Sequence, residues 1–258
     1  LSRYEADNVV VATGGYQAAR IPVFAAELDP SIVQLHSSDY RNSSQLRDGG
    51  VLVVGAGNSG AEIALESSRG HRTWLSGRDT GQEPVRVGGG ADRLFTPPFW
   101  FLLSHVLTVR SPIGRKARQQ LTGRGLPLAR VRRKDLIRAG ITRVPRVTGV
   151  REGLPMLADG ENLDVANVIW CTGFMTELSW IDLPVFDPDG EPRHERGVVR
   201  SEPGLYFIGL FFLSTAASSL IGGVDRDARH IARHIASQRA DGGGAAQEAS
   251  RTTEKASD

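Results

Sequence analysis

The chain has 258 residues, of which 40% are hydrophobic and 23% are charged, and its formal net charge at pH 7 is +2. This length is sufficient for one large domain or two ordinary domains, and the composition is typical of globular proteins. No uninterrupted apolar run reaches about 18 residues, so we expect no transmembrane segment. The first residues, Leu1 to Asp7, lack the basic and apolar regions of a signal peptide.

Cysteine and histidine usage argues against metal binding and against disulfide chemistry. Cys171 is the only cysteine, which excludes a disulfide framework within the chain, a Cys-x-x-Cys redox pair and a cysteine zinc site. His230 and His234 are four residues apart but lie among arginines, so we expect a solvated helix face rather than a pair of metal ligands. We therefore expect a cytoplasmic protein without a bound metal.

The first apolar run, Asn8 to Ala12, predicts a buried strand that ends in a turn of small residues at Thr13 and Gly14. Small residues at a strand end allow a bulky group to approach the backbone. The stretch from Pro22 to Ser44 is interrupted by prolines and rich in serine, and it predicts a long connector.

The next segment contains a Gly-x-Gly-x-x-Gly motif in a strand–turn–helix context. Val51–Val54 predicts a buried strand, and an apolar-periodic segment after the glycines predicts a helix. In such a unit Gly55 permits the tight turn, Gly57 leaves room for a pyrophosphate, and Gly60 lets the helix pack closely on the strand. The free N–H groups at the helix start would hold the phosphates. The alternative is a glycine turn with a purely structural role.

A second strand is predicted at His71–Ser76. Units that bind NAD place an acidic residue about 20 residues after the first glycine, to hold the ribose. Ser76 and Arg78 stand at that place instead. A hydroxyl and a guanidinium suit a 2′-phosphate, which favours NADPH over NADH, although the neighbouring Asp79 weakens this preference. The alternative is that Arg78 is a solvated loop residue.

Two stretches in the middle of the chain have an unusual composition. Arg93 to Val109 is rich in aromatic residues and leucine, which predicts core packing. The alternatives are the lining of a channel for an apolar substrate and a face that lies on a membrane surface. Arg110 to Arg146 contains twelve lysines or arginines and one acidic residue. We expect a solvated basic face beside a phosphate site. Aromatic residues do not alternate with these basic residues, so nucleic-acid binding is not expected.

The later part of the chain repeats the strand-then-glycine theme. Asn167 to Phe174 and Gly204 to Leu210 each predict an apolar strand ending at glycine, and Val224 to Gln238 predicts a helix. From Asp241 onward the composition is glycine, alanine, serine and charge, which predicts a disordered tail.

Taken together, these motifs resemble those of the flavin-dependent monooxygenases of the flavin-containing and Baeyer–Villiger type. The resemblance rests on residues 11–16, 55–60, 171–174 and 205–210, in that order. The run His36-Ser37-Ser38-Asp39-Tyr40 is also similar to the end of the signature of that group. The match covers about residues 8–238.

The resemblance implies an α/β fold with two nested, three-layer Rossmann-like domains, one for FAD and one for NADPH. The expected division is a remnant of the FAD-binding domain at 1–30, the NADPH-binding domain at 31–175, the C-terminal part of the FAD-binding domain at 176–240 and the tail at 241–258. The family opens with its own glycine fingerprint for FAD, and none precedes Asn8. The FAD-binding domain is therefore expected to be incomplete.

The resemblance also implies roles for single residues. Those implied for the NADPH pyrophosphate are Gly55, Gly57, Asn58, Ser59 and Gly60, and those for the 2′-phosphate are Ser76 and Arg78. Those implied on the flavin side are Thr13, Gly14, Gly209, Gly222 and Gly223. No catalytic side chain is singled out.

The implied activity is hydride transfer from NADPH to FAD, followed by insertion of one oxygen atom from O2 into a small, apolar organic substrate. Two alternatives stay open. One is a non-catalytic NADPH-binding module, and the other is a relative of the pyridine nucleotide-disulfide reductases without redox cysteines.

Overall fold

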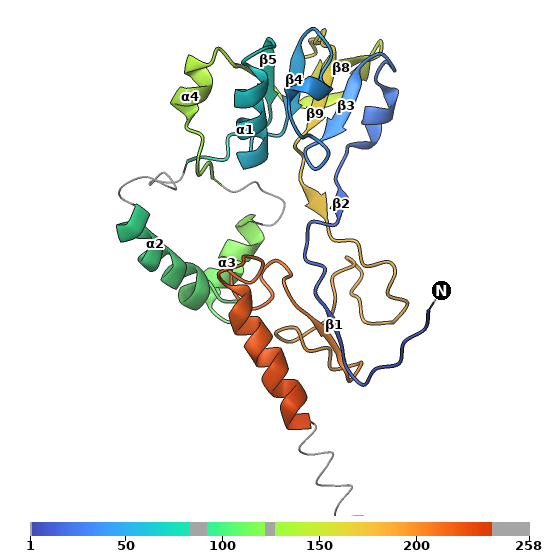
Figure 1. The fold of residues 1–258 in the computed structure, drawn as a ribbon, viewed down its shortest axis with the longest axis vertical. Coiled ribbons are helices and arrows are strands. Elements are labelled where there is room, and N and C mark those ends of the chain that lie inside the picture. Colours follow the sequence, from blue (N-terminus) through green and yellow to red (C-terminus); the bar gives the residue numbers. More distant parts are fainter. Residues whose placement is uncertain (1, 83–91, 122–126, 239–258) are drawn as a thin grey trace, which may run out of the picture. The chain divides into compact units, whose positions relative to one another are not determined.

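The computed structural model describes residues 2–82, 92–121 and 127–238, which divide into two compact units (Figure 1). The sheet unit consists of the described parts of Tyr16–Phe99 and Gln119–Thr176. The strand-pair unit consists of the described parts of Leu1–Gly15, Trp100–Arg118 and Glu177–Asp258. Compared with the expected boundaries, residues 16–30 group with the sheet unit and residues 100–118 with the strand-pair unit. The predicted tail at 241–258 lies outside the described residues.

The sheet unit is built on five parallel strands. In spatial order they are β3 (Val33–His36), β9 (Asn167–Trp170), β4 (Val51–Val54), β5 (Thr73–Ser76) and β6 (Thr142–Val144). All residues of β9, β4 and β5 are buried. Parallel strands covered on both faces need continuous apolar runs, which is the pattern that the sequence showed at 51–54.

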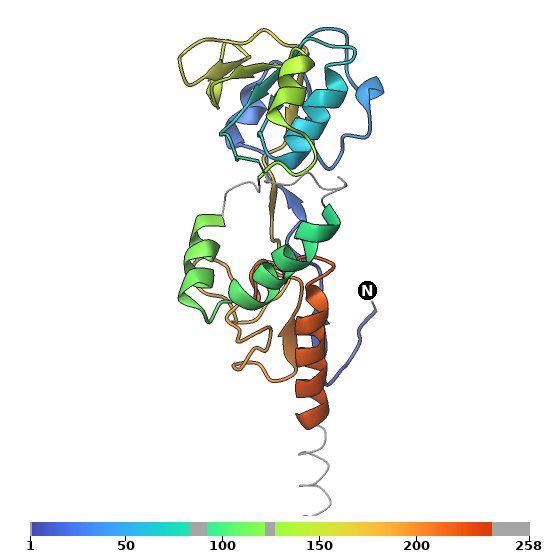
Figure 2. The ribbon, with the colours of Figure 1, turned by 90° about the vertical axis from the view of Figure 1, so that its left-hand side faces the viewer.

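Two helices cover one face of this sheet. They are α1 (Asn58–Ser67) and α4 (Arg133–Arg138), and Figure 2 shows them beside each other in front of the strands. Val51 and Val53 point to this face, because alternate side chains of a strand share one side, and they pack with Ala61 of α1.

The opposite face is covered by a short helix, η1 (Val23–Glu27), and a hairpin formed by β7 (Val147–Arg151) and β8 (Leu154–Leu157). Leu52, Trp74 and Trp170 are buried beneath them. The sheet unit therefore has three layers, and the predicted α/β, Rossmann-like fold is confirmed.

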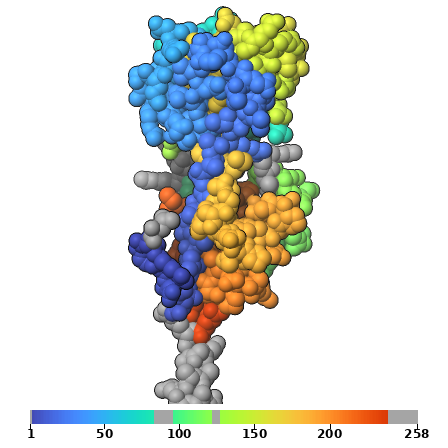
Figure 3. Space-filling model, turned by 90° about the vertical axis from the view of Figure 1, so that its right-hand side faces the viewer, coloured from blue at the N-terminus to red at the C-terminus, as the bar shows by residue number. Residues whose placement is uncertain are grey.

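The prediction that Pro22 to Ser44 is a connector is wrong in part, because the stretch contains regular elements. This stretch contains η1, the edge strand β3 and a short helix, η2 (Ser43–Gln45). In the space-filling view the blue segment that includes β3 covers one side of the sheet unit (Figure 3). The hydrogen bonds of β3 to β9 come from a partner more than 130 residues later in the chain, so local sequence does not reveal them.

The strand-pair unit joins strands from early and late parts of the chain. Its strands β1 (Val9–Val11) and β11 (Leu205–Phe207) are parallel, with Val9 opposite Leu205. Residues 224–238 form the expected helix, drawn in orange-red in Figure 1. The core of this unit consists of Val11, Leu178, Val185, Val199, Leu205, Phe207, Leu210 and Leu213.

The aromatic stretch from Arg93 to Val109 forms helices with exposed apolar side chains. It forms α2 (Asp92–Phe101) and a π-helical turn, η3 (Leu102–Val106), and it is followed by α3 (Pro112–Leu121). Phe99, Phe101 and Leu102 are exposed, so the prediction of core packing is wrong for these three side chains. Within the described residues, no helix is long and apolar enough to cross a membrane.

A short antiparallel ribbon of β2 (Ala18–Ala19) and β10 (Phe174–Met175) completes the sheet unit. Each of its strands lies within three residues of a point where the chain passes from one unit to the other.

Candidate functional site

Gly55 and Gly60 are required by the turn between β4 and α1. Gly55 has a φ of +110°, and a Cβ atom there would overlap the carbonyl oxygen of Cys171. A Cβ atom on Gly60 would overlap the carbonyl oxygen of Gly55. These two glycines let α1 pack directly against the end of β4, in agreement with the roles expected from the sequence.

Gly57 is different, because the fold does not require a glycine there. Its backbone has φ −78° and ψ −167°, which any residue can adopt, and no atom lies within 4 Å of the place where a Cβ would stand. Gly57 is also the N-cap of α1 and has no side chain to cap the helix. The first N–H groups of a helix have no partner within it, so this open space is a place where an anion can approach.

The next two residues differ in what their side chains do. Asn58 donates from Nδ2 to the carbonyl oxygen of Pro127 over 3.1 Å and accepts from the N–H of Ala129 over 2.9 Å. Its side chain therefore ties a loop to α1, and only its backbone is available to a ligand. Ser59 is exposed on the first turn of the helix.

Ser76 has a structural role. Its side chain is fully buried, and its hydroxyl donates to the carbonyl oxygen of Pro145 over 2.8 Å. The same hydroxyl accepts a hydrogen bond from the N–H of Val147 over 3.1 Å. These bonds join the end of β5 to the start of β7. With its only proton donated and its surface buried, Ser76 is not available to a 2′-phosphate.

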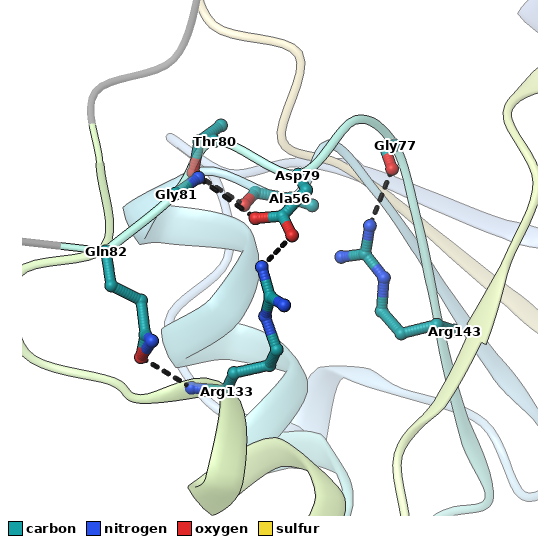
Figure 4. A network of polar contacts seen from close by, with 8 residues as sticks. All are labelled: Ala56, Gly77, Asp79, Thr80, Gly81, Gln82, Arg133 and Arg143. Carbon is teal, nitrogen blue, oxygen red and sulfur yellow. Dashed lines mark hydrogen bonds and ion pairs between the residues drawn. The ribbon is translucent and has the colours of Figure 1, made fainter.

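Arg78 is exposed, and within the described part of the chain it has no hydrogen bond or ion pair. The neighbouring carboxylate of Asp79 accepts from the N–H of Gly81 over 2.9 Å and pairs with Arg133 (Figure 4). The Gly81 N–H, with a further contribution from Arg133, holds the pKa of Asp79 below its usual value. The carboxylate of Asp79, beside Arg78, therefore already has a hydrogen bond and an ion pair within the chain.

A second arginine, Arg143 on β6, lies on the other side of this loop (Figure 4). Its guanidinium donates to the carbonyl oxygen of Gly77 over 2.6 Å, and burial lowers its pKa. Sequence reasoning did not single out Arg133 or Arg143. The sequence feature that could have indicated them is the basic stretch from Arg110 to Arg146, which contains both residues. In the structure, both lie near the carboxyl end of β5.

The strand-pair unit places Gly14 and Gly209 next to each other. They follow the paired strands β1 and β11, and the N–H of Ile208 donates to the carbonyl oxygen of Val11 over 2.9 Å. Both glycines have positive φ, +70° and +77°, and a Cβ on Gly209 would meet only the Cα of Gly14, at 3.9 Å. Thr13 is exposed beside them. A bulky group can therefore approach the ends of these two strands.

Packing within the chain accounts for Gly222 and Gly223. A Cβ on Gly222 would lie 2.9 Å from the ring of Trp100, and one on Gly223 would overlap the carbonyl oxygen of Ala217. Both glycines allow the tight approach of the chain to the helix at 224–238.

Metal-ligating clusters and a reactive thiol are absent from the described residues. None of their His, Cys, Asp and Glu side chains form a group of three or more that could hold a metal ion. Burial raises the pKa of the Cys171 thiol to about 12, although part of the residue stays accessible. Such a thiol is protonated at neutral pH and is a poor nucleophile.

Comparison with known proteins shows similarity to oxidoreductases and to flavin-dependent monooxygenases. Residues 2–86 match the family model described as pyridine nucleotide-disulphide oxidoreductase. The chain is 40% identical over 235 residues to a protein of Geobacillus kaustophilus named uncharacterized oxidoreductase CzcO-like, covering 90% of this chain and 65% of that protein. It is 27% identical to the probable indole-3-pyruvate monooxygenase YUCCA3 of Arabidopsis thaliana, over 89% of this chain and 57% of that protein.

A solved structure supports the same relationship. The flavin-containing monooxygenase from Stenotrophomonas maltophilia is 26% identical, with a TM-score of 0.58, over 90% of this chain and 62% of that one. The chain is therefore similar to flavoprotein monooxygenases over most of its length. The resemblance inferred from the motifs is thereby confirmed at the level of the family. The chain spans 65% of the length of its Geobacillus relative.

Proposed function

We propose that the sheet unit binds NADPH and that the strand-pair unit contributes to an FAD site. In the proposed role the chain serves a monooxygenase that inserts one oxygen atom from O2 into a small, apolar organic substrate. The observation that carries this proposal is the open space at Gly57, between two glycines that the turn requires. A glycine that the fold does not need, at the start of a helix, is what a pyrophosphate requires.

The preference for NADPH rests on Arg78. This exposed guanidinium follows β5, where an enzyme specific for NAD places an acid on the ribose. The nearby acid, Asp79, is paired with Arg133 and so does not compete for a ribose hydroxyl. A planar guanidinium can donate two parallel hydrogen bonds to a phosphate. Ser76 is left out of this part of the proposal, because its hydroxyl is used inside the fold.

The residues of the chain bind and orient the cofactors. When bound, NADPH supplies a hydride and FAD supplies the chemistry that uses oxygen. The N–H groups at the start of α1, at Asn58, Ser59 and Gly60, would hold the pyrophosphate. Gly14 and Gly209 leave the strand ends free of side chains, where a flavin can approach. Gly222 and Gly223 shape the approach to the helix at 224–238, whose N-terminus favours negative charge.

The proposed apolar substrate and the cytoplasmic location have weaker support. Phe99, Phe101 and Leu102 present exposed apolar side chains on α2 and η3, as a site for an apolar substrate requires. A cytoplasmic location agrees with a chain that contains a single, reduced cysteine.

Two other functions are kept as competing candidates. A disulfide reductase is favoured by the family model that matches residues 2–86, but the sequence contains only Cys171 and therefore no redox pair. A non-catalytic NADPH-binding module uses the same turn at Gly55–Gly60 without a flavin.

Cofactor binding by the 258-residue chain separates these candidates. We expect saturable binding of NADPH by calorimetry, weaker binding of NADH, and loss of both in Gly57→Leu. Absence of NADPH binding would remove the central proposal. Flavin is followed separately, by visible absorbance after incubation with FAD and desalting. Binding of NADPH without any retention of FAD would favour the non-catalytic module for this chain.

A further inference from the structure

The strand-pair unit contains a cavity of about 430 Å³ that the proposed function does not use. Its volume falls within the range of pockets that bind small molecules, which is about 300–1,000 Å³. Its arginine, glutamate and histidine residues come from three segments, with Arg110 on one, Glu195, Arg196 and Arg200 on the second, and His230 and His234 on the helix at 224–238. No residue of the glycine turn at 55–60 belongs to it.

The lining has an excess of positive charge. Glu195 is the only acidic residue among the lining residues, and it pairs with Arg110 over 3.4 Å and with Arg200. Arg196 is the third arginine, and it forms no ion pair with this carboxylate. The lining therefore contains three guanidinium groups and one carboxylate, a net charge of +2 before either histidine is protonated. A concave surface of one sign of charge concentrates counter-ions.

The backbone at Arg196 is strained. Arg196 has a φ of +51° and Gly197 a φ of +89°. The N–H of Glu195 donates to the carbonyl oxygen of Val198 over 2.9 Å, and the N–H of Val198 donates back over 3.1 Å. This is a two-residue hairpin turn of the kind that prefers Asn-Gly, because both central residues have positive φ. Asparagine tolerates this conformation better than arginine does, and strain of this kind concentrates at ligand-binding sites.

The environment of His230 also suits an anion. Burial lowers the pKa of His230, and Arg196, His234 and Arg110 lower it further, while Asp227 raises it. The imidazole therefore loses its proton more readily than a free histidine. An anion that arrives among these groups offsets the arginine charges and favours the protonated ring, which can then donate a hydrogen bond.

We propose that this cavity binds a small phosphate monoester, with Arg196 and His230 as its main contacts. A planar guanidinium fork suits phosphate oxygens, and the imidazolium supplies a further donor. The cavity, which Tyr206 also lines, is larger than a bare phosphate group, so there is room for an organic substituent. The cavity would act as an anion site of this unit in addition to the proposed cofactor sites.

The first test is calorimetric titration of the 258-residue chain with inorganic phosphate and with phenyl phosphate, at constant ionic strength. We expect saturable binding of both, tighter for phenyl phosphate. Arg196→Asn removes the charge while keeping a residue suited to positive φ, so it should weaken binding at least fivefold without loss of thermal stability. Arg233→Gln, on an exposed position of the same helix and outside the lining, should change binding less than twofold.

A second variant separates this site from the dinucleotide site. Arg78→Ala should leave phenyl phosphate binding unchanged if the ligand occupies the cavity. Binding lost in Arg78→Ala but kept in Arg196→Asn would place the anion at the dinucleotide turn and overturn the proposal. Equal weakening by Arg196→Asn and Arg233→Gln would show only general charge attraction, which also overturns it.

Imidazole NMR of the wild-type chain gives an independent readout. Sulfate is used because it does not titrate between pH 5 and 8, and its addition should raise the pKa of His230. Because of linkage, sulfate should bind more tightly as the pH falls through that pKa. An unchanged His230 titration at saturating sulfate would contradict the proposal even if some anion binding is measured.

Discussion

The Nε2 atom of His36 donates a hydrogen bond of 2.9 Å to the carbonyl oxygen of Gly173. Its Nδ1 atom accepts from the N–H of Ser38 over 3.2 Å, so the ring proton belongs on Nε2. The same carbonyl oxygen accepts from the N–H of Arg20 over 3.0 Å. One backbone oxygen thus joins the end of β3 to the ribbon of β2 and β10, where the chain leaves the sheet unit.

His36→Phe tests this junction. Phenylalanine keeps a ring that can contact Phe174, which lies 5.0 Å from the imidazole, centroid to centroid, but it removes the donor. We expect the free energy of unfolding to fall by about 0.5–1.5 kcal/mol, the net contribution of one hydrogen bond, because the carbonyl oxygen of Gly173 keeps the N–H of Arg20 as a partner. Urea unfolding followed by circular dichroism measures this. An unchanged midpoint would show that the bond contributes nothing to stability.

Arg78→Ala tests whether Arg78 binds the 2′-phosphate of NADPH. Loss of a hydrogen bond to a charged group should weaken NADPH binding by about 1.5–3 kcal/mol, or roughly ten- to a hundredfold. The affinity for NADH should barely change, because NADH lacks the 2′-phosphate. Titration of both nucleotides provides the measurement, with Arg69→Ala, an exposed residue after α1, as the matched control. Equal losses for the two nucleotides would contradict the assignment.

Gly57 and Gly60 should respond in opposite ways to a larger side chain. Gly57→Leu should fold with a melting temperature close to that of the wild type and lose nucleotide binding, because its side chain enters open space where the pyrophosphate would lie. Gly60→Ala should be destabilised, since its Cβ would overlap the carbonyl oxygen of Gly55. Thermal unfolding and NADPH titration of both variants compare the two effects. Wild-type affinity in Gly57→Leu would remove the pyrophosphate from this turn.

Ser76→Ala should affect stability rather than cofactor choice. The substitution leaves the carbonyl oxygen of Pro145 and the N–H of Val147 without their side-chain partner, at a cost of about 1–3 kcal/mol. The ratio of NADPH to NADH affinity should stay at the wild-type value. A shift of that ratio toward NADH would show that the hydroxyl does contact the 2′-phosphate.

Cys171 should be unreactive in the folded protein. With a pKa of about 12, its thiolate is scarce at pH 8, whereas an unfolded cysteine has a pKa of about 8.5. Because thiolate is the reacting form, modification by a thiol reagent should be much slower in buffer than in urea and should accelerate as the pH rises. Equal rates in the folded and unfolded chain would contradict this environment.

Local patterns were sufficient to predict the unit β4–α1–β5. Val51–Val54 is apolar throughout, the glycines follow at once, and the helix begins within four residues of the strand. The close approach of Gly60 to Gly55 is local to this turn, whereas the contact of Gly55 with Cys171 and the hydrogen bonds of Asn58 to Pro127 and Ala129 involve distant residues. The strand at Asn167–Trp170 was predicted for the same reason, since it is buried on both faces.

Features that depend on distant partners were not predictable in the same way. In β3, Gln34 interrupts the apolar pattern, and its side chain accepts from the ring N–H of Trp170 and donates to the carbonyl oxygen of Ala25. The positions of Arg133 and Arg143 around the loop at Gly77 depend on the order of strands in the sheet. The buried role of Ser76 likewise depends on partners about 70 residues later.

The pairing of β1 with β11 has a consequence for the order of folding. Val9 is matched with Leu205, so this contact closes a loop of nearly 200 residues, and the entropy cost of loop closure rises with length. The sheet unit lies almost entirely within that loop and contains local strand–helix–strand contacts that close much sooner. During synthesis the first strand emerges long before its partner. The sheet unit is therefore expected to fold before β1 pairs with β11. Its formation shortens the effective loop that this pairing must close.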